Sequence, residues 1–223
     1  MNFFLGVEVS QTAAGIHLCR QRYISDILKR ANMSLAKPIT SPMSSSATFS
    51  KFDGVKFDDA TLYRSVVGAL QYLSITRPNI AFTVNKVSQF MNEPQDTHWS
   101  AIKRILCYLK HTIDHGLFIK KCSSNQLFAF SDADWAGCPD DIRSTSGFCI
   151  FLGSNLLSWS SKKQPIVSRS TTESEYKSMA NTAADLCWLQ SLFSELGVFL
   201  PTAPILFCDN ISATYFGKSS FSC

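Results

Sequence analysis

The sequence is short of charge, of histidine and of long apolar runs, and each shortage excludes a class of protein. Only 17% of its 223 residues are charged and 45% are hydrophobic, as in a globular protein with a charge-poor surface. No apolar run approaches the roughly 20 residues that a membrane-spanning helix needs. The four histidines and the cysteines show no zinc-ligand spacing, which argues against a structural zinc site.

The eight cysteines do not form a Cys-any-any-Cys motif. Most lie inside apolar runs such as "ILCYL", "FCIF" and "DLCWL", where cysteine behaves as a small buried hydrophobe. The sequence shows no secretory signal at its start, and free thiols are typical of reducing compartments. We therefore expect an intracellular location, cytoplasmic or nuclear, with no membrane partner.

The charge that is present is unevenly distributed. Residues 1–121 hold 15 Lys and Arg against 8 Asp and Glu, a balance of +7, and residues 122–223 hold 6 against 9, a balance of −3. A basic half beside an acidic half is typical of a polyanion-binding platform next to a metal site, although chance segregation of surface charge gives the same pattern. We divide the chain into two domains at this point, 1–121 and 122–223.

The periodicity predicts a mixed α/β protein, with helices in the first half and a sheet with one long helix in the second. A hairpin is expected within residues 3–19, and helices over 20–33, 58–77, 79–94 and 97–116, with a Ser/Pro-rich loop at 34–58. Strands are then expected at 116–121, 127–134, 145–153 and 156–163, followed by a long helix at 170–197, a buried central strand at 203–210 and a helix from residue 211.

Three acids fall where such a fold would bring them together. Asp132 closes a strand, Glu175 lies in the first turns of the long helix on the same side as Met179, and Asp209 follows the apolar run "ILFC". If the two strands are neighbours, the carboxylates of Asp132 and Asp209 converge and Glu175 reaches them. Such a set without histidine suits Mg²⁺ or Mn²⁺, which prefer carboxylate oxygens. The spacing alone leaves a metal site and isolated acids both open.

The neighbouring acids are less informative. A calcium loop counted from Asp132 would place Arg143 at its twelfth position, where a bidentate glutamate is needed. Asp140 and Asp141 fit a turn around "CPDDIRSTSG" better than they fit a ligand role. Asp134 shares the strand phase of Asp132 and is the reserve ligand.

Several stretches together resemble the C-terminal part of copia-type retrotransposon Pol polyproteins. They are "FLGVEV", "YRSVVGALQYLSITRPNIAFTVNKVSQFM", "SDADWAGCPDDIRSTSGFCIFLG", "SWSSKKQPIVSRSTTESEY" and "FCDNISA". The resemblance covers about residues 3–217, and these motifs are specific in combination. It implies that residues 1–121 are a helical remnant from the end of a reverse transcriptase, and that residues 122–223 are an incomplete ribonuclease H-like domain.

The resemblance also implies roles for the three acids. Asp132 of "SDAD" matches the first catalytic aspartate of the family, Glu175 of "ESEY" the catalytic glutamate, and Asp209 of "CDN" the second aspartate. The implied activity is Mg²⁺-dependent (or Mn²⁺-dependent) cleavage of the RNA strand in an RNA·DNA hybrid. Asp132 would bridge two ions, and Glu175 and Asp209 would hold one ion each.

The basic loop before the long helix is the expected nucleic-acid contact. Exposed lysines before a helix are usually only solvated, but Lys162, Lys163 and Arg169 are placed where they could touch the phosphate backbone. The expected partners are an RNA·DNA hybrid or another nucleic acid, and other retroelement proteins.

Two departures from the family weaken the expected activity. No Tyr-any-Asp-Asp motif is present, so we expect no polymerase active site and no DNA synthesis. The family continues after "CDNISA" to a fourth acidic ligand, whereas this sequence ends in "YFGKSSFSC", as a premature stop or an incomplete gene model would leave it. We therefore expect weak or lost cleavage. The alternative is a non-enzymatic retroelement remnant that at most binds nucleic acid loosely.

Overall fold

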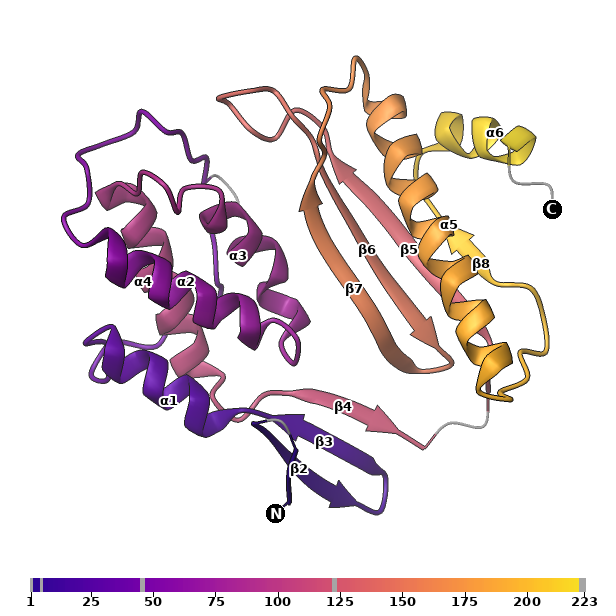
Figure 1. The fold of residues 1–223 in the computed structure, drawn as a ribbon, viewed down its shortest axis with the longest axis horizontal. Coiled ribbons are helices and arrows are strands. Elements are labelled where there is room, and N and C mark those ends of the chain that lie inside the picture. The colour runs from indigo at the N-terminus through magenta and orange to yellow at the C-terminus, as the bar shows by residue number, and fades with distance from the viewer. Residues whose placement is uncertain (1, 5, 45–46, 122–123, 221–223) are drawn as a thin grey trace. The chain divides into compact units, whose positions relative to one another are not determined.

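The computed structural model describes residues 2–4, 6–44, 47–121 and 124–220, and the chain divides into two compact units. Unit 1 is Met1–Ile119 and unit 2 is Lys120–Cys223, so the division falls two residues before the expected boundary after residue 121. The protein is mixed α/β, with helices and strands in both units (Figure 1). Within the described ranges, no helix is both long and apolar enough to cross a lipid bilayer.

Unit 1 combines a small sheet with a group of helices. The strands are β1 (Asn2–Phe4), β2 (Val7–Thr12), β3 (Gly15–Cys19) and β4 (Leu117–Lys120), paired in that order. The helices are α1 (Gln21–Arg30), α2 (Ala60–Leu73), a 3₁₀ turn (Pro78–Ile80), α3 (Ala81–Ser88) and α4 (Asp96–His111). Their buried apolar faces form one core around Tyr63, Leu70 and Ile105. Residues between α1 and α2 form turns and coil, as the Ser/Pro-rich composition predicts.

A buried arginine fixes the turn that precedes α3. Arg77 is only 2% exposed. Its guanidinium donates to the Thr112 carbonyl (2.9 Å), to Thr112 Oγ1 (2.6 Å) and to Asn79 Oδ1 (3.2 Å). A buried guanidinium without such acceptors would be costly, so these bonds tie the end of α4 to the start of the 3₁₀ turn.

Two basic side chains of α4 serve the fold rather than a solvated basic face. Arg104 donates to Ser41 Oγ (2.8 Å) and Lys110 donates to the Ser34 carbonyl (2.6 Å), so both hold the segment that joins α1 to α2. Lys103 of the same helix is exposed. Helical spacing marks the polar face of α4, but it does not show that a distant loop covers part of that face.

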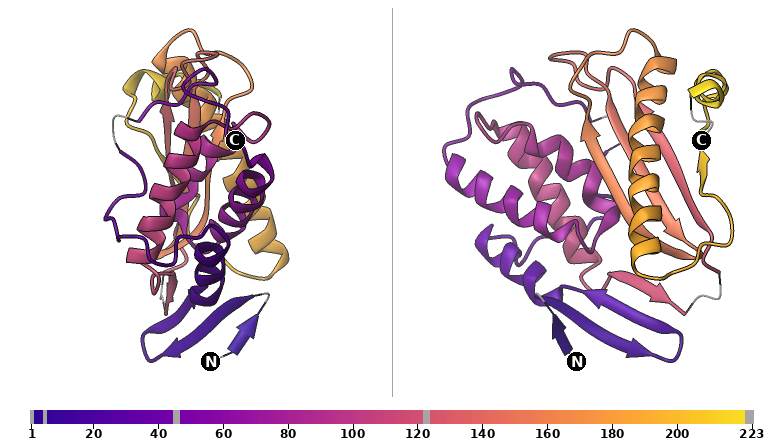
Figure 2. Two further views of the ribbon diagram at one scale, coloured as in Figure 1. Left: turned by 90° about the vertical axis from the view of Figure 1, so that its left-hand side faces the viewer. Right: turned by 45° about the vertical axis from the view of Figure 1, so that its right-hand side comes forward.

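Unit 2 is a sheet with one long helix along one face. Its elements are β5 (Leu127–Asp134), β6 (Thr145–Leu152), β7 (Asn155–Lys163), α5 (Thr171–Glu195), β8 (Ile205–Phe207) and α6 (Ile211–Ser220). The strand order is β7-β6-β5-β8, antiparallel except for β8, which runs parallel to β5. The views in Figures 1 and 2 show α5 lying lengthwise over this sheet.

The sequence of unit 2 explains this packing. Along β5 the side chains alternate between buried and more exposed positions, with Leu127 and Ala129 on the buried face. Leu186, Leu189 and Phe193 of α5 pack onto that face. Burying each side chain of this size stabilises the fold by about 1.5–3 kcal/mol.

Both ends of α5 carry capping groups. The Ser170 hydroxyl accepts from the Glu173 N–H (3.2 Å), and the Glu173 carboxylate accepts from the Arg169 N–H (2.8 Å). At the other end Gly197 adopts φ +70°, and the Val198 N–H returns to the Phe193 carbonyl at 2.8 Å. Glycine takes this left-handed conformation at no steric cost, so it ends the helix where the sequence predicts.

The strand before Asp209 differs from its prediction. We expected a buried central strand over 203–210, but β8 has three residues and lies at the edge of the sheet. Ile205 is 45% and Phe207 47% exposed. An apolar run shows that a segment is hydrophobic, but it does not show how many neighbours its strand has.

The cysteines agree with their prediction only in part. Those in the described ranges are free thiols, as expected, but Cys107 and Cys149 are only half-buried and Cys187 of "DLCWL" is exposed. It follows Leu186 on α5 and turns away from the sheet, because adjacent helical residues point about 100° apart. Cys122 and Cys223 lie outside the described residues.

Candidate metal centre

The structure brings the three expected acids together from three elements. Asp132 is the sixth residue of β5, Glu175 lies in the second turn of α5, and Asp209 comes two residues after β8. Because β8 pairs with β5 in parallel, with Phe130 opposite Phe207, both aspartates lie at the same end of neighbouring strands. The carboxylate of Glu175 approaches this end from α5.

One backbone amide orients two of the carboxylates. The Ala133 N–H donates to Asp132 Oδ1 (2.9 Å) and to Glu175 Oε1 (3.2 Å). β8 ends at Phe207 and does not pair with this part of β5, which leaves the amide available to the side chains. A shared donor holds both carboxylates close to each other in spite of their like charge.

Glu175 is the buried member of the set. It is 7% exposed, whereas Asp132 and Asp209 are exposed. Burial, together with the negative charges of Asp132 and Asp209, raises the pKa of Glu175 to about 7, although the Ala133 N–H opposes the shift. A cation at this place would relieve that repulsion, so the electrostatics of the set fit a bound positive ion.

A thiol belongs to the same cluster. Cys208 Sγ lies 3.9 Å from Glu175 Oε2, and one ligand atom each from Glu175, Cys208 and Asp209 lie within 4.8 Å of one another. Burial raises the pKa of the Cys208 thiol, and the charges of Glu175 and Asp209 raise it further. The carboxylate set is therefore bordered by a sulfur donor.

Two polar side chains fix α5 against the sheet beside the cluster. Ser178, one turn after Glu175, donates to the Asp132 carbonyl (2.8 Å) and lies within 3.4 Å of the Gly147 carbonyl. Gln164, before the helix, donates to Ser146 Oγ and to the Ser174 carbonyl, both at 2.9 Å. These bonds set the height and rotation of the turn that carries Glu175.

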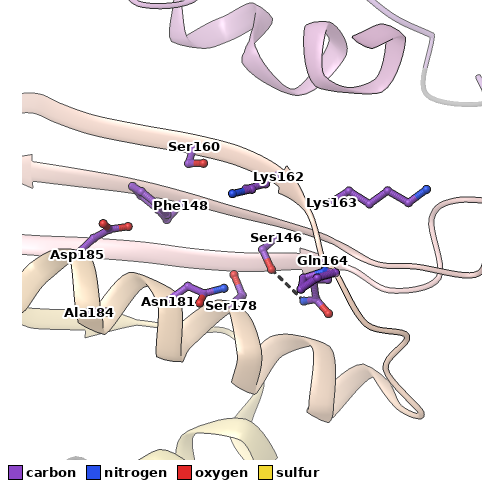
Figure 3. Close-up of a pocket in the computed structure, with 11 residues that line it drawn as sticks. Ser146, Phe148, Ser160, Lys162, Lys163, Gln164, Ser178, Asn181, Ala184 and Asp185 are labelled. Carbon is purple, nitrogen blue, oxygen red and sulfur yellow. Dashed lines mark hydrogen bonds between the residues drawn. The ribbon is translucent and has the colours of Figure 1, made fainter. Parts of the chain in front are cut away.

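A groove of about 710 Å³ lies between α5 and the strands β6 and β7 (Figure 3). Lys162 lines it from β7, opposite Asn181 and Asp185 of α5. Lys163 extends away from the other lining side chains in Figure 3 and forms an ion pair with Asp141 at 2.8 Å. Of the expected nucleic-acid contacts, Lys162 and Arg169 are exposed, whereas Lys163 already holds a partner within the protein.

The neighbouring acids Asp134 and Asp141 contact the turn after β5 rather than Glu175. Partial burial would raise the pKa of Asp141, but hydrogen bonds from Lys163, Cys138 and the Arg143 N–H hold it at about 2. The Asp134 carboxylate packs so tightly on Gly137 that a Cβ there would lie 2.0 Å from Asp134 Oδ2. The turn thus occupies both residues. In the described ranges, Asp132 and Asp134 both lie outside the Glu175–Cys208–Asp209 group, but Asp132 shares the Ala133 amide with Glu175.

Sequence reasoning missed three members of this site, namely the Ala133 amide, Ser178 and Cys208. Nothing in a sequence marks a backbone amide that a short neighbouring strand leaves unpaired. Cys208 did carry a signal, because a residue directly before a candidate ligand at a strand end lies close to the same site. Treating every cysteine as a buried hydrophobe concealed it.

The chain is similar to parts of much longer proteins. The retrovirus-related Pol polyprotein from transposon RE2 of Arabidopsis thaliana is 49% identical over 215 residues, 96% of this chain and 15% of that protein. The retrovirus-related Pol polyprotein from transposon TNT 1-94 of Nicotiana tabacum is 34% identical, over 97% of this chain and 17% of that protein. An uncharacterized mitochondrial protein of Arabidopsis thaliana is 46% identical over 84% of this chain and 78% of its own length. No family model and no solved structure matches the chain.

Proposed function

Because this chain belongs to the retrovirus-related Pol polyproteins of transposons, we propose that unit 2 is a ribonuclease H-type nuclease unit of a copia-type element. Its substrate would be the RNA strand of an RNA·DNA hybrid, and its cofactor Mg²⁺ or Mn²⁺. The observation that carries this proposal is that Glu175 meets both aspartates at one end of the sheet: it shares the Ala133 amide with Asp132, and its ligand atom lies within 4.8 Å of that of Asp209. Unit 1 would be the end of the reverse transcriptase.

The donor set fits such an ion. Three carboxylates supply only hard oxygen ligands, which Mg²⁺ and Mn²⁺ prefer. The raised pKa of Glu175 supports a cation site, because the burial and the negative neighbours that cause it are compensated when a cation binds. When bound, divalent ions would stabilise the negative charge that develops on the phosphodiester during cleavage.

The protein side chains would orient this chemistry. The Ala133 amide fixes Asp132 and Glu175, and Ser178 locks the helix against β5, so these two carboxylates would be held in place when an ion binds. Asp132 and Asp209 are exposed and would be the ligands open to substrate. Lys162 and Arg169 would contact phosphates, and Lys163 would instead keep the turn around Asp141 in place.

The turnover that we propose is slow. The described cluster offers three carboxylates, enough to hold one ion well and a second ion poorly. Cleavage by two ions loses stabilisation of either the attacking or the leaving oxygen when one ion is poorly held. Losing one preorganised electrostatic contact of that kind typically costs about 10²–10³ in rate. Ion binding is therefore a better primary measurement than cleavage.

The test compares two matched variants of the full chain. Asp132→Asn removes a proposed ligand, and Asp185→Asn makes the same chemical change on α5 outside the acidic cluster. We expect Mn²⁺ binding, followed by calorimetry, to weaken at least about tenfold in Asp132→Asn and to stay unchanged in Asp185→Asn. Any cleavage of a labelled hybrid in Mg²⁺ or Mn²⁺ should disappear in Asp132→Asn.

Equal Mn²⁺ affinity in all three proteins would refute the ion site. Mn²⁺ binding that depends on Asp132, with hybrid binding but no cleavage under any condition, would refute the nuclease. That second result would favour a non-enzymatic protein that binds nucleic acid.

A further inference from the structure

The acidic cluster has a second side that the nuclease proposal does not use. Asp132 and Cys208 approach Glu175 from different positions, since Asp132 shares the Ala133 amide with Oε1 and the Cys208 thiol approaches Oε2. On the thiol side, the Glu175, Cys208 and Asp209 ligand atoms lie within 4.8 Å of one another. One sulfur and two carboxylates therefore converge on a volume the size of a metal ion.

A buried hydroxyl points to a ligand at the same place. Ser131 is 6% exposed, and among the described residues the only hydrogen bond of its Oγ is a marginal one to the Cys208 thiol. The parallel register of β5 and β8 places Ser131 beside Cys208, where the hydroxyl touches the thiol. A neutral thiol is a weak acceptor, so a metal-bound thiolate would give this buried hydroxyl a stronger hydrogen-bond partner than it has in the metal-free protein.

The donor set determines which ion would fit. Thiolate sulfur selects Zn²⁺ and its heavier analogue Cd²⁺ over Mg²⁺, whereas carboxylates accept all of them. Zn²⁺ in proteins commonly takes three protein ligands and keeps a further position for water.

We propose that Glu175, Cys208 and Asp209 form a site for a thiophilic divalent cation, with Zn²⁺ as its natural occupant, and that this ion inhibits the nuclease. Binding forms a metal–sulfur bond and releases the thiol proton to solvent. Because Glu175 and Asp209 are also proposed ligands of Mg²⁺, the two ions compete for the same carboxylates. The inhibitory role rests on the proposed function, whereas binding of the thiophilic ion does not.

Cd²⁺ is the probe, because a cadmium–thiolate bond has its own ultraviolet charge-transfer absorption. The reduced, metal-stripped full chain is titrated with Cd²⁺, beside Cys208→Ser, Cys208→Ala and the control Cys187→Ser. The control removes an exposed thiol from the same unit. We expect both Cys208 variants to lose the high-affinity Cd²⁺ site, so that Cd²⁺ binds at least about tenfold more weakly. The Cys187→Ser control should bind Cd²⁺ as the wild type does.

Thermal melts without metal establish that each variant is folded, and having two variants guards against the misfolding of one. A wild-type Cd²⁺ titration in both folded Cys208 variants would overturn the proposal. Zn²⁺ that fails to displace Cd²⁺ would overturn the assignment of Zn²⁺ as occupant. Zn²⁺ that binds but leaves bound Mn²⁺ in place would overturn the competition.

The experiment also separates this proposal from the nuclease. Asp132 is outside the thiol set, so Asp132→Asn should keep the charge-transfer band while it loses Mn²⁺. Cd²⁺ bound through Cys208 in a protein with no Mn²⁺ site would support the thiol site and refute the nuclease. Asp132-dependent Mn²⁺ binding with Cd²⁺ binding indifferent to Cys208 would do the reverse.

Discussion

Replacing Glu175 with glutamine should change how the stability of the metal-free protein depends on pH. The folded chain protonates Glu175 with a pKa of about 7, against an ordinary value of 4.5, because the side chain is buried and lies beside Asp132 and Asp209. Between these two values the folded protein holds a proton that the unfolded chain has released. The contribution of Glu175 to stability is therefore fully present below pH 4.5 and is lost as the pH rises through 7.

The magnitude follows from the two pKa values. Each pH unit between them corresponds to about 1.36 kcal/mol, which gives a ceiling of about 3 kcal/mol across the window. Asp132 and Asp209 are exposed and water screens their charges, so we expect about 1–2 kcal/mol. Glutamine can still accept from the Ala133 N–H but does not titrate. Glu175→Gln should therefore gain stability relative to the wild type as the pH rises.

The assay is denaturant unfolding in chelator-treated buffer at about pH 5 and about pH 8. Tryptophan fluorescence reports mainly on unit 2, because three of the four tryptophans, at positions 135, 159 and 188, lie there. Glu195→Gln, in the last turn of the same helix and exposed, is the matched control and should follow the wild type. A stability difference between Glu175→Gln and the wild type that is the same at both pH values would refute this reasoning.

Two further predictions concern the fold around the site and the core of unit 1. Arg77→Lys should destabilise unit 1 by about 2–3 kcal/mol in denaturant unfolding, because an ammonium group cannot reproduce the fork of bonds to Thr112 and Asn79. A loss below about 0.5 kcal/mol would contradict the role given to the guanidinium. Asp141→Asn should cost less than about 1 kcal/mol at neutral pH, because its ion pair with Lys163 is partly exposed. The depressed pKa of Asp141 means that this stability is lost as the pH falls toward 2, which acid titration of the two proteins would show.

The elements of unit 2 were predictable where local chemistry and periodicity agree. The alternating pattern of residues 127–134 predicts β5 to the residue, and Ser170 and Gly197 mark the two ends of α5. A side-chain acceptor before the first turn and a left-handed glycine after the last turn act through bonds to adjacent backbone, so the sequence is sufficient to find them. The position of Glu175 on the sheet side of α5 follows from the same helical period.

What the sequence could not supply are properties set by distant neighbours. β8 is short and lies at the edge because it pairs only with β5, over three residues. The apolar run "ILFC" is compatible with either an edge strand or a central strand. The basic face of α4 is partly covered because a loop far along the chain accepts hydrogen bonds from Arg104 and Lys110. The Ala133 amide can donate to Asp132 and Glu175 only because β8 ends before it reaches this part of β5. Each of these facts requires knowing which segments meet.

The alternation of side chains along the strands explains why one cluster offers two kinds of cation site. In β5 and along its parallel neighbour, successive residues point to opposite faces of the sheet, so Ser131 and Cys208 face α5 while Phe130 and Phe207 stack on the other face at 5.2 Å. Asp132, two residues after Phe130, begins on that other face. Glu175 extends from α5 to the Ala133 amide, beyond the point where β8 ends. Its Oε1 therefore lies on the side of Asp132 and its Oε2 on the side of the Cys208 thiol. The proposed Mg²⁺ ligands (Asp132, Glu175 and Asp209) and the proposed Zn²⁺ ligands (Glu175, Cys208 and Asp209) are therefore not independent. Both sets need the same buried carboxylate of Glu175. Substitutions at Asp132 and Cys208 can separate the two ion chemistries, whereas a substitution at Glu175 must affect both.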